Sequence, residues 1–113
     1  MSDLPDSVEE AFDFATPLIS DWEVKQIRRA VDLDELIPGP HAEDKAILLD
    51  IDIDDFFHVI KYGKAVSKDL PHNNDNRAEG INFEGRTPAG RRIRLKIGWW
   101  HGYYEIATAH FIR

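Results

Sequence analysis

Residues 81–112 read INFEGRTPAGRRIRLKIGWWHGYYEIATAHFI, and apolar and polar side chains alternate along them with the period of a β-strand. Two turns interrupt this alternation. Pro88-Ala89-Gly90 fits a three-residue hairpin loop, in which proline enters a type I turn and glycine supplies a positive φ. His101-Gly102 fits a two-residue turn, where glycine again tolerates a positive φ. The stretch therefore predicts three antiparallel strands joined by two hairpins.

The turns also fix the register of the strands. The first turn predicts the pairs Thr87–Arg91, Gly85–Ile93, Phe83–Leu95 and Ile81–Ile97. The second turn predicts the pairs Trp100–Tyr103, Ile97–Ile106, Leu95–Thr108 and Ile93–His110. A slip of one residue in either register would move the side chains of a strand to the opposite face of the sheet. The two registers place the side chains of the central strand on the same faces, so they support each other.

The two predicted faces differ in chemistry. The core face comprises Ile81, Phe83, Ile93, Leu95, Ile97, Trp99, Tyr104, Ile106, Thr108, His110 and Ile112. The opposite face comprises Asn82, Glu84, Arg86, Arg92, Arg94, Lys96, Trp100, Tyr103, Glu105, Ala107, Ala109 and Phe111. We expect helices to cover the first face.

The residues before the hairpins favour helices. Capping boxes at Ser7–Glu10 and Ser20–Glu23 predict helices over residues 7–16 and about 20–36, and Pro38-Gly39-Pro40 ends the second. An N-cap at Asp52 or Asp54 predicts a third helix that ends near Gly63, in the left-handed region.

The shorter segments complete the expected fold. Residues 47–49 suit either a short strand or a packed connector, residues 64–68 a short strand, and residues 71–80 a polar loop. The sequence thus predicts a single α+β domain over residues 1–113. Two to three N-terminal helices pack on one face of a three- to four-stranded antiparallel sheet.

Charge divides the chain into an acidic and a basic part. Residues 1–60 hold 16 acidic and 4 basic side chains, whereas residues 61–113 hold 5 acidic and 10 basic ones, and the net charge is −7. This acidity opposes non-specific binding to nucleic acid, because phosphates are repelled at long range. The chain has no cysteine, no secretory signal and no long apolar run. We therefore expect a cytoplasmic protein without a membrane partner.

The polar face carries the candidate binding residues. Arg92, Arg94 and Lys96 form a basic row on the central strand, and Trp100, Tyr103 and Phe111 flank it. Cations and aromatic rings beside the small Ala107 and Ala109 suit single-stranded RNA, because bases stack on aromatic side chains. Alternatively, Glu84 neutralises Arg94, or the row docks acidic helices or an acidic partner. The exposed aromatic residues also suit a homodimer contact.

No cofactor or metal is indicated. Asp50, Asp52 and Asp54 alternate like the start of a calcium loop, but Asp55 and Lys61 occupy the positions that need glycine and glutamate. Carboxylates at the start of a helix are explained by its dipole.

The chain resembles the barnase–EndoU–colicin–RelE-like group of small toxin ribonucleases in the order of its elements. Two or three helices are followed by a hairpin segment, Gly85–Leu95, and a final strand, Glu105–Phe111. The resemblance covers about residues 50–113. It implies an α+β fold with an RNA-facing sheet and metal-free RNA cleavage. It also implies that the cations of the basic row stabilise the phosphate, while His101, His110 or Tyr103 moves protons. Both histidines also suit purely structural roles. His101 fits a turn position, and His110 fits the edge of the core, where its side chain faces away from the basic row.

Two classes of function follow from these features. One is a ribonuclease-like domain that binds or cleaves RNA through the basic face, or a relative that kept the fold and lost the chemistry. The other is a non-enzymatic, acidic protein-protein interaction module, such as an antitoxin, an immunity protein or a regulator. The sequence leaves open whether the protein is an enzyme.

Overall fold

The computed structural model describes residues 19–69, 79–100 and 102–112. Its elements are α2 (Asp21–Asp32), β1 (Leu36–Pro38), α3 (Pro40–Leu49), α4 (Ile53–Tyr62), β2 (Lys64–Asp69), β3 (Gly80–Arg86), β4 (Arg92–Trp100) and β5 (Tyr103–Phe111). The strands form one sheet in the order β1-β5-β4-β3-β2. The predicted α+β class is confirmed, but the sheet has five strands rather than three to four. The helix expected over residues 7–16 lies outside the described residues.

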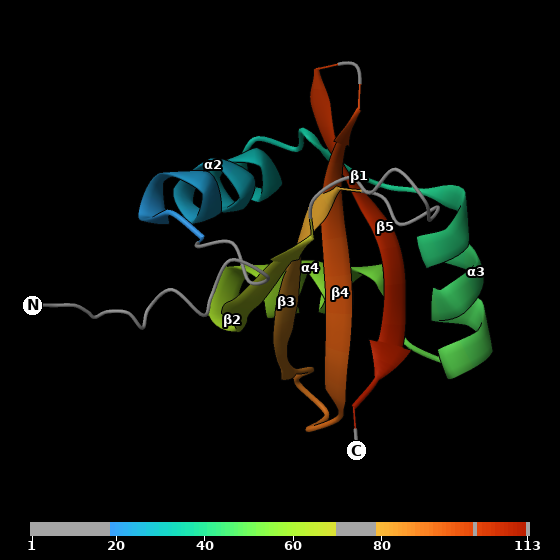
Figure 1. The fold of residues 1–113 in the computed structure, drawn as a ribbon. Helices are drawn as coiled ribbons and strands as arrows, with labels where there is room; N and C mark the ends of the chain where they lie inside the picture. Colours follow the sequence, from blue (N-terminus) through green and yellow to red (C-terminus); the bar gives the residue numbers. More distant parts are fainter. Residues whose placement is uncertain (1–18, 70–78, 101, 113) are drawn as a thin grey trace, which may run out of the picture.

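The helices and the sheet enclose one core. Figure 1 shows α4 behind the sheet, α2 beside the upper end of the strands and α3 along the outer side of β5. From α4, Phe56, Val59 and Ile60 are fully buried. They join buried side chains of β3 and β4, among them Phe83 and Leu95, in a single hydrophobic cluster. The predicted aliphatic face of β3 and β4 is therefore the core face.

The segment after α2 differs from the prediction. The capping box at Ser20 forms as expected, but the helix ends at Asp32 instead of near Leu36. Asp34 then takes a positive φ of 62°, and Leu36 begins β1. This three-residue strand pairs in parallel with β5, and Leu36 is only 5% exposed. Strand pairing and burial of Leu36 therefore override the helical pattern.

Residues 40–49 form a helix, whereas the sequence suggested a strand or a connector for its last three positions. Pro40 stands in the first turn of α3, where its missing N–H costs nothing. Ala42 and Ala46 are buried on α3, as is Ala109 on β5. These small side chains let the helix pack along the part of β5 that β1 does not cover, and so protect an open sheet edge.

The two hairpins confirm the predicted turns, but only one confirms the full register. β3 and β4 pair as predicted, including Phe83 with Leu95. β4 and β5 pair as predicted only near their turn. Thr108 pairs with Lys96 while Ile106 pairs with Ile97, so Ala107 forms a β-bulge. The predicted pairs of Leu95 with Thr108 and Ile93 with His110 are therefore wrong.

The bulge inverts the second half of β5. Ala109, expected on the polar face, pairs with Leu95 and is fully buried. His110, expected on the core face, pairs with Arg94 and is exposed. The extra residue in β5 causes this exchange, since side chains alternate between faces along a strand.

The start of α4 agrees with the sequence prediction, whereas its end differs from it. Asp52 caps the first turn as expected, accepting a hydrogen bond from the Asp54 N–H. Gly63 is extended rather than left-handed, and a Cβ there would lie 2.5 Å from the Glu84 carbonyl oxygen. Arg28 of α2 donates hydrogen bonds to the carbonyl oxygens of Ile60 and Gly63 at this end of α4. No helix in the described part of the chain is long and apolar enough to cross a membrane.

Candidate functional site

The basic row lies on one face of the sheet, but its central cation is paired within the chain. Arg94 forms an ion pair with Glu84, the residue opposite on β3, at 3.1 Å. Its second terminal nitrogen donates to the Ser67 hydroxyl at 2.9 Å. The guanidinium group is therefore held flat across β3 and β2, and the alternative of a cross-strand pair with Glu84 is confirmed.

Lys96 is paired in the same way. Its ammonium group lies 2.9 Å from a carboxylate oxygen of Asp69 on β2, and its side chain is only 12% exposed. The lysine reaches β2 across Gly80, where a Cβ would lie 2.9 Å from the Lys96 Cγ. Asn82, 5% exposed, donates hydrogen bonds to Ser67 and Asp69 and so joins the two ion pairs. The centre of this face is therefore a neutralised polar network.

The basic character of this face remains at one end of the sheet. Arg92 is exposed, pairs across the strands with Arg86, and forms no ion pair with any described residue. The bulge adds His110 to the same face, directly opposite Arg94. On the other face, the guanidinium group of Arg91 lies 4.1 Å from the centre of the Phe111 ring, a cation–π contact.

The two predicted proton-transfer residues that the structure describes, Tyr103 and His110, are far apart. Tyr103 and His110 lie near opposite ends of β5, and seven residues of strand span about 23 Å. His101 and the side chain of Trp100 lie outside the described residues. Because Tyr103 and Phe111 also lie at opposite ends of β5, they do not form one aromatic patch.

A second surface, which we call the acidic groove, lies where α3 ends and α4 begins. It has a volume of about 970 Å³. Its lining residues are Glu43, Asp44, Ala46, Ile47, Asp50, Ile51, Asp52, Ile53 and Asp55. None of these carboxylates forms an ion pair in the part of the chain that the structure describes. The same described residues contain no cluster of metal-binding side chains.

A third feature, which we call the aromatic cleft, separates α2 from the β4–β5 hairpin. Its volume is about 450 Å³. Its lining residues are Trp22, Glu23, Ile27, Ile81, Trp99, Gly102, Tyr103 and Tyr104. Trp99 and Tyr104 are paired across the hairpin, whereas Trp22 comes from α2 and is 66% exposed. The cleft thus has aromatic side chains on both walls.

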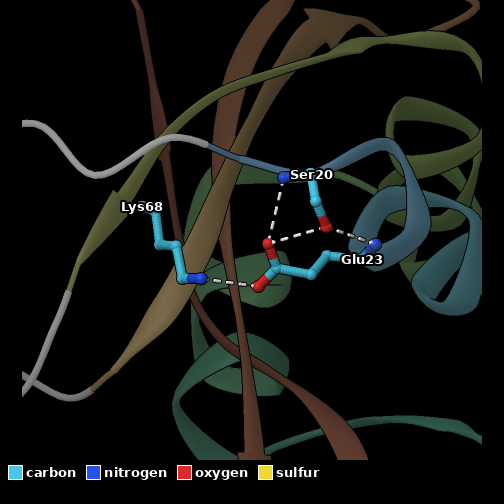
Figure 2. Close-up of polar contacts among 3 residues, drawn as sticks. All are labelled: Ser20, Glu23 and Lys68. Atoms are coloured by element: carbon cyan, nitrogen blue, oxygen red, sulfur yellow. Dashed lines mark hydrogen bonds and ion pairs between the residues drawn. The ribbon is translucent and has the colours of Figure 1, made fainter.

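The capping box of α2 orients the carboxylate of the aromatic cleft, as Figure 2 shows. One oxygen of Glu23 accepts hydrogen bonds from the backbone N–H and the hydroxyl of Ser20, at 3.0 and 3.1 Å. The other oxygen accepts from the Lys68 ammonium group at 2.7 Å. These contacts hold the side chain in one position at the edge of the cleft.

Two pKa shifts follow from this arrangement. The hydrogen bond from Lys68 contributes most to lowering the pKa of Glu23 below its ordinary value, with the Ser20 backbone N–H next. Burial raises the pKa of Tyr104, and the negative charge of Glu23 raises it further. At neutral pH the cleft therefore contains an ionised carboxylate and a neutral phenol.

Sequence reasoning identified neither the acidic groove nor the aromatic cleft. Residues 40–55 contain six carboxylates and one lysine, which is the sequence signal of the groove, but the helix dipole accounts only for Asp50, Asp52 and Asp54. The cleft joins α2 to a hairpin about 75 residues later, which no local pattern reveals.

Comparison of the chain with protein-family models, curated proteins and solved structures found no match. The resemblance to toxin ribonucleases stays a prediction.

Proposed function

We propose that this protein is a non-enzymatic interaction module that binds a basic protein partner through the acidic groove. The proposal depends on one observation: the carboxylates of the groove are unpaired among the described residues, whereas Arg94 and Lys96 on the sheet are paired. The negative charge of α3 and α4 is therefore available to a partner, whereas the centre of the basic row is neutralised within the chain.

The groove combines this charge with apolar side chains. Ile47 on α3 is 81% exposed and Leu48 is 73% exposed. Ile47 also lines the groove, between Asp44 and Asp50 on its two sides. Apolar residues at the centre and charged residues at the rim are typical of protein interfaces. A basic segment with one or two apolar side chains suits this surface.

Charge complementarity also suits a regulatory partner. Carboxylates around an interface raise the association rate of a basic protein and oppose acidic competitors. A basic nucleic-acid-binding protein or a toxin meets this requirement, in line with the antitoxin, immunity or regulatory role that the sequence predicts.

The test is affinity capture with two matched charge reversals. Asp44→Lys with Asp55→Lys changes the groove, and Asp21→Lys with Glu35→Lys makes the same change in net charge elsewhere. Asp21 and Asp55 both lie in the first turn of a helix, so both pairs lose a similar interaction with a helix dipole. We expect a basic partner to bind the wild type and the second variant, and to be lost from the first. Equal capture by both variants would refute the proposal.

RNA binding through the end of the sheet is a second candidate, because the bulge brings His110 onto the face of Arg92 and Arg94. These side chains favour phosphate binding, because cations and imidazole N–H groups donate hydrogen bonds to phosphate oxygens. Cleavage is not supported by a paired acid and base, since Tyr103 lies about 23 Å from His110 along the strand.

Fluorescence anisotropy with a single-stranded RNA oligonucleotide tests this candidate. We expect Arg92→Ala to weaken binding and to lower the slope of log affinity against log salt by about 1. Lys25→Ala, on the exposed side of α2, is the matched control. The candidate is wrong if wild type does not bind at low salt, or if both variants lose affinity equally.

A further inference from the structure

The aromatic cleft has two walls of different chemistry. The sheet wall carries Trp99 and Tyr104, which are half-buried neighbours on the β4–β5 hairpin. The helix wall carries Trp22 and the carboxylate of Glu23. Figure 1 shows the hairpin extending past the other strands of the sheet beside α2.

The cleft has a negative charge but no positive one among its lining residues. Lys68 pairs with Glu23, yet it does not line the cleft. A molecule in the cleft therefore meets the aromatic rings and a carboxylate whose ion-pair partner, Lys68, is not among the lining residues. Lys68, at 2.7 Å, offsets part of this negative charge, and the rest of the attraction for a cation comes from the faces of the aromatic rings.

These features distinguish between the possible occupants. An anion would be repelled by Glu23 and by the negative faces of the rings. A purely apolar group would strip water from the carboxylate without replacing its interactions. An organic cation gains from both the rings and the carboxylate, because ammonium groups bind the faces of tryptophan and tyrosine.

We infer that the aromatic cleft binds an organic cation of the methylated-ammonium class, with Trp22, Trp99 and Tyr104 against its methyl groups and Glu23 opposite its charge. A methylated ammonium is preferred over a bare one, since its methyl groups bury apolar surface against the partly exposed rings of Trp22, Trp99 and Tyr104. The volume of about 450 Å³ is that of a small-molecule site.

The surrounding groups support this assignment. Ile27 and Ile81 are fully buried, so the floor of the cleft is fixed by the core. Burial raises the pKa of Tyr104 and the charge of Glu23 raises it further, so the phenol lies in the negative field of that carboxylate. The cleft and the acidic groove share no residues, so this inference is independent of the proposed function.

The experiment is a titration of the full chain with choline, followed by the indole N–H signals of its three tryptophans in NMR. The first control ligand is the neutral alcohol in which carbon replaces the ammonium nitrogen of choline, because it matches the shape without the charge. We expect choline to shift the signals of Trp22 and Trp99 with millimolar affinity, and the neutral alcohol to bind at least about tenfold more weakly.

Two variants test the residues. Glu23→Gln keeps the capping group but removes the charge, and we expect affinity for choline to fall about threefold to tenfold. Trp22→Ala removes an exposed ring with little effect on the fold, and we expect a loss of about threefold or more. Tyr62→Ala removes a 74% exposed ring on α4 and should leave affinity unchanged.

A trimethyl-lysine peptide distinguishes the source of the cation. Tighter binding than choline assigns the site to a modified protein side chain, and weaker binding assigns it to a free small molecule. Equal binding of choline and its neutral analogue would overturn the inference, as would shifts that Trp22→Ala and Glu23→Gln leave unchanged. Absence of binding by choline and by the peptide would also overturn it.

Discussion

Replacing Glu23 with glutamine should destabilise the protein in a way that depends on pH. The amide oxygen of the new side chain can still accept the two hydrogen bonds from Ser20, which lie at 3.0 and 3.1 Å from the carboxylate in the wild type. The neutral amide cannot form the ion pair with Lys68 at 2.7 Å, so one charge-assisted hydrogen bond is lost. The change therefore isolates a single interaction of α2 with β2.

The magnitude follows from the burial of the pair. A hydrogen bond to a charged group contributes about 1.5–3 kcal/mol when buried, whereas an exposed ion pair contributes about 0.2–1 kcal/mol. The side chains of Lys68 and Glu23 are 18% and 21% exposed, which is between these limits. We expect a loss of about 1 kcal/mol at pH 7, which lowers Tm by about 4–6 °C in a domain of this size.

The sign of the pH dependence follows from the lowered pKa of Glu23. A carboxyl group whose folded pKa is depressed stabilises the protein above its unfolded pKa and loses this contribution as pH falls through the folded value. The contribution is therefore complete above the ordinary value of 4.5 and declines at lower pH. The difference in Tm between wild type and Glu23→Gln should shrink in acid.

Thermal unfolding followed by circular dichroism measures this difference. Glu35→Gln is a control, since Glu35 is exposed and forms no ion pair with described residues. Lys68→Met and the double variant complete a cycle that gives the coupling energy directly. A difference in Tm that stays constant from pH 7 into acid, or a coupling energy of zero, would refute the reasoning.

Two other substitutions test the sheet. Ala109→Leu should lower the free energy of unfolding in urea by about 1–3 kcal/mol, because Ala109 is fully buried by the bulged register. His110→Leu should change it by less than about 0.5 kcal/mol, and the opposite ranking would indicate the unbulged register. Asn82→Ala should cost about 1–3 kcal/mol, since it removes the donor shared by Ser67 and Asp69. Ser67→Ala should cost less in the same urea titration, and a larger loss than for Asn82→Ala would contradict the central role of the amide.

Local chemistry explains the parts of the fold that could be predicted. Gly90 and Gly102 both have a positive φ, at 89° and 90°, as their turns required. Ser20 and Asp52 cap the helices that they were expected to begin. The faces of β3 and β4 alternate as predicted, so Phe83 and Leu95 enter the core together.

The segments whose secondary structure was predicted wrongly have a common cause: contacts with residues distant in the sequence override the local pattern. Residues 40–49 become a helix whose buried alanines pack on Ala109, although Ile47 and Leu48 then point to solvent. Leu36 leaves the expected helix because β5 offers it a strand partner. Neither β5 nor its bulge is visible in the sequence around these residues.

The candidate sites also have one part that the local sequence predicts and another that depends on distant contacts. The sequence placed Arg92, Arg94 and Lys96 on one face and offered Glu84 as a partner of Arg94, but it gave no sign that Asp69 pairs with Lys96. Ion pairs depend on which strands become neighbours, and β2 reaches this network only through its place at the edge of the sheet.

The amino-acid sequence by itself determined the turns, the helix caps, the α+β class and the alternation of β3 and β4, because each depends on residues close together in the chain. Tertiary structure alone decided the bulge at Ala107, the parallel strand at Leu36, the neutralised basic row and the aromatic cleft. Each of these features depends on packing, strand pairing or ion pairs between residues far apart in the sequence. Such contacts are set only when the chain has folded.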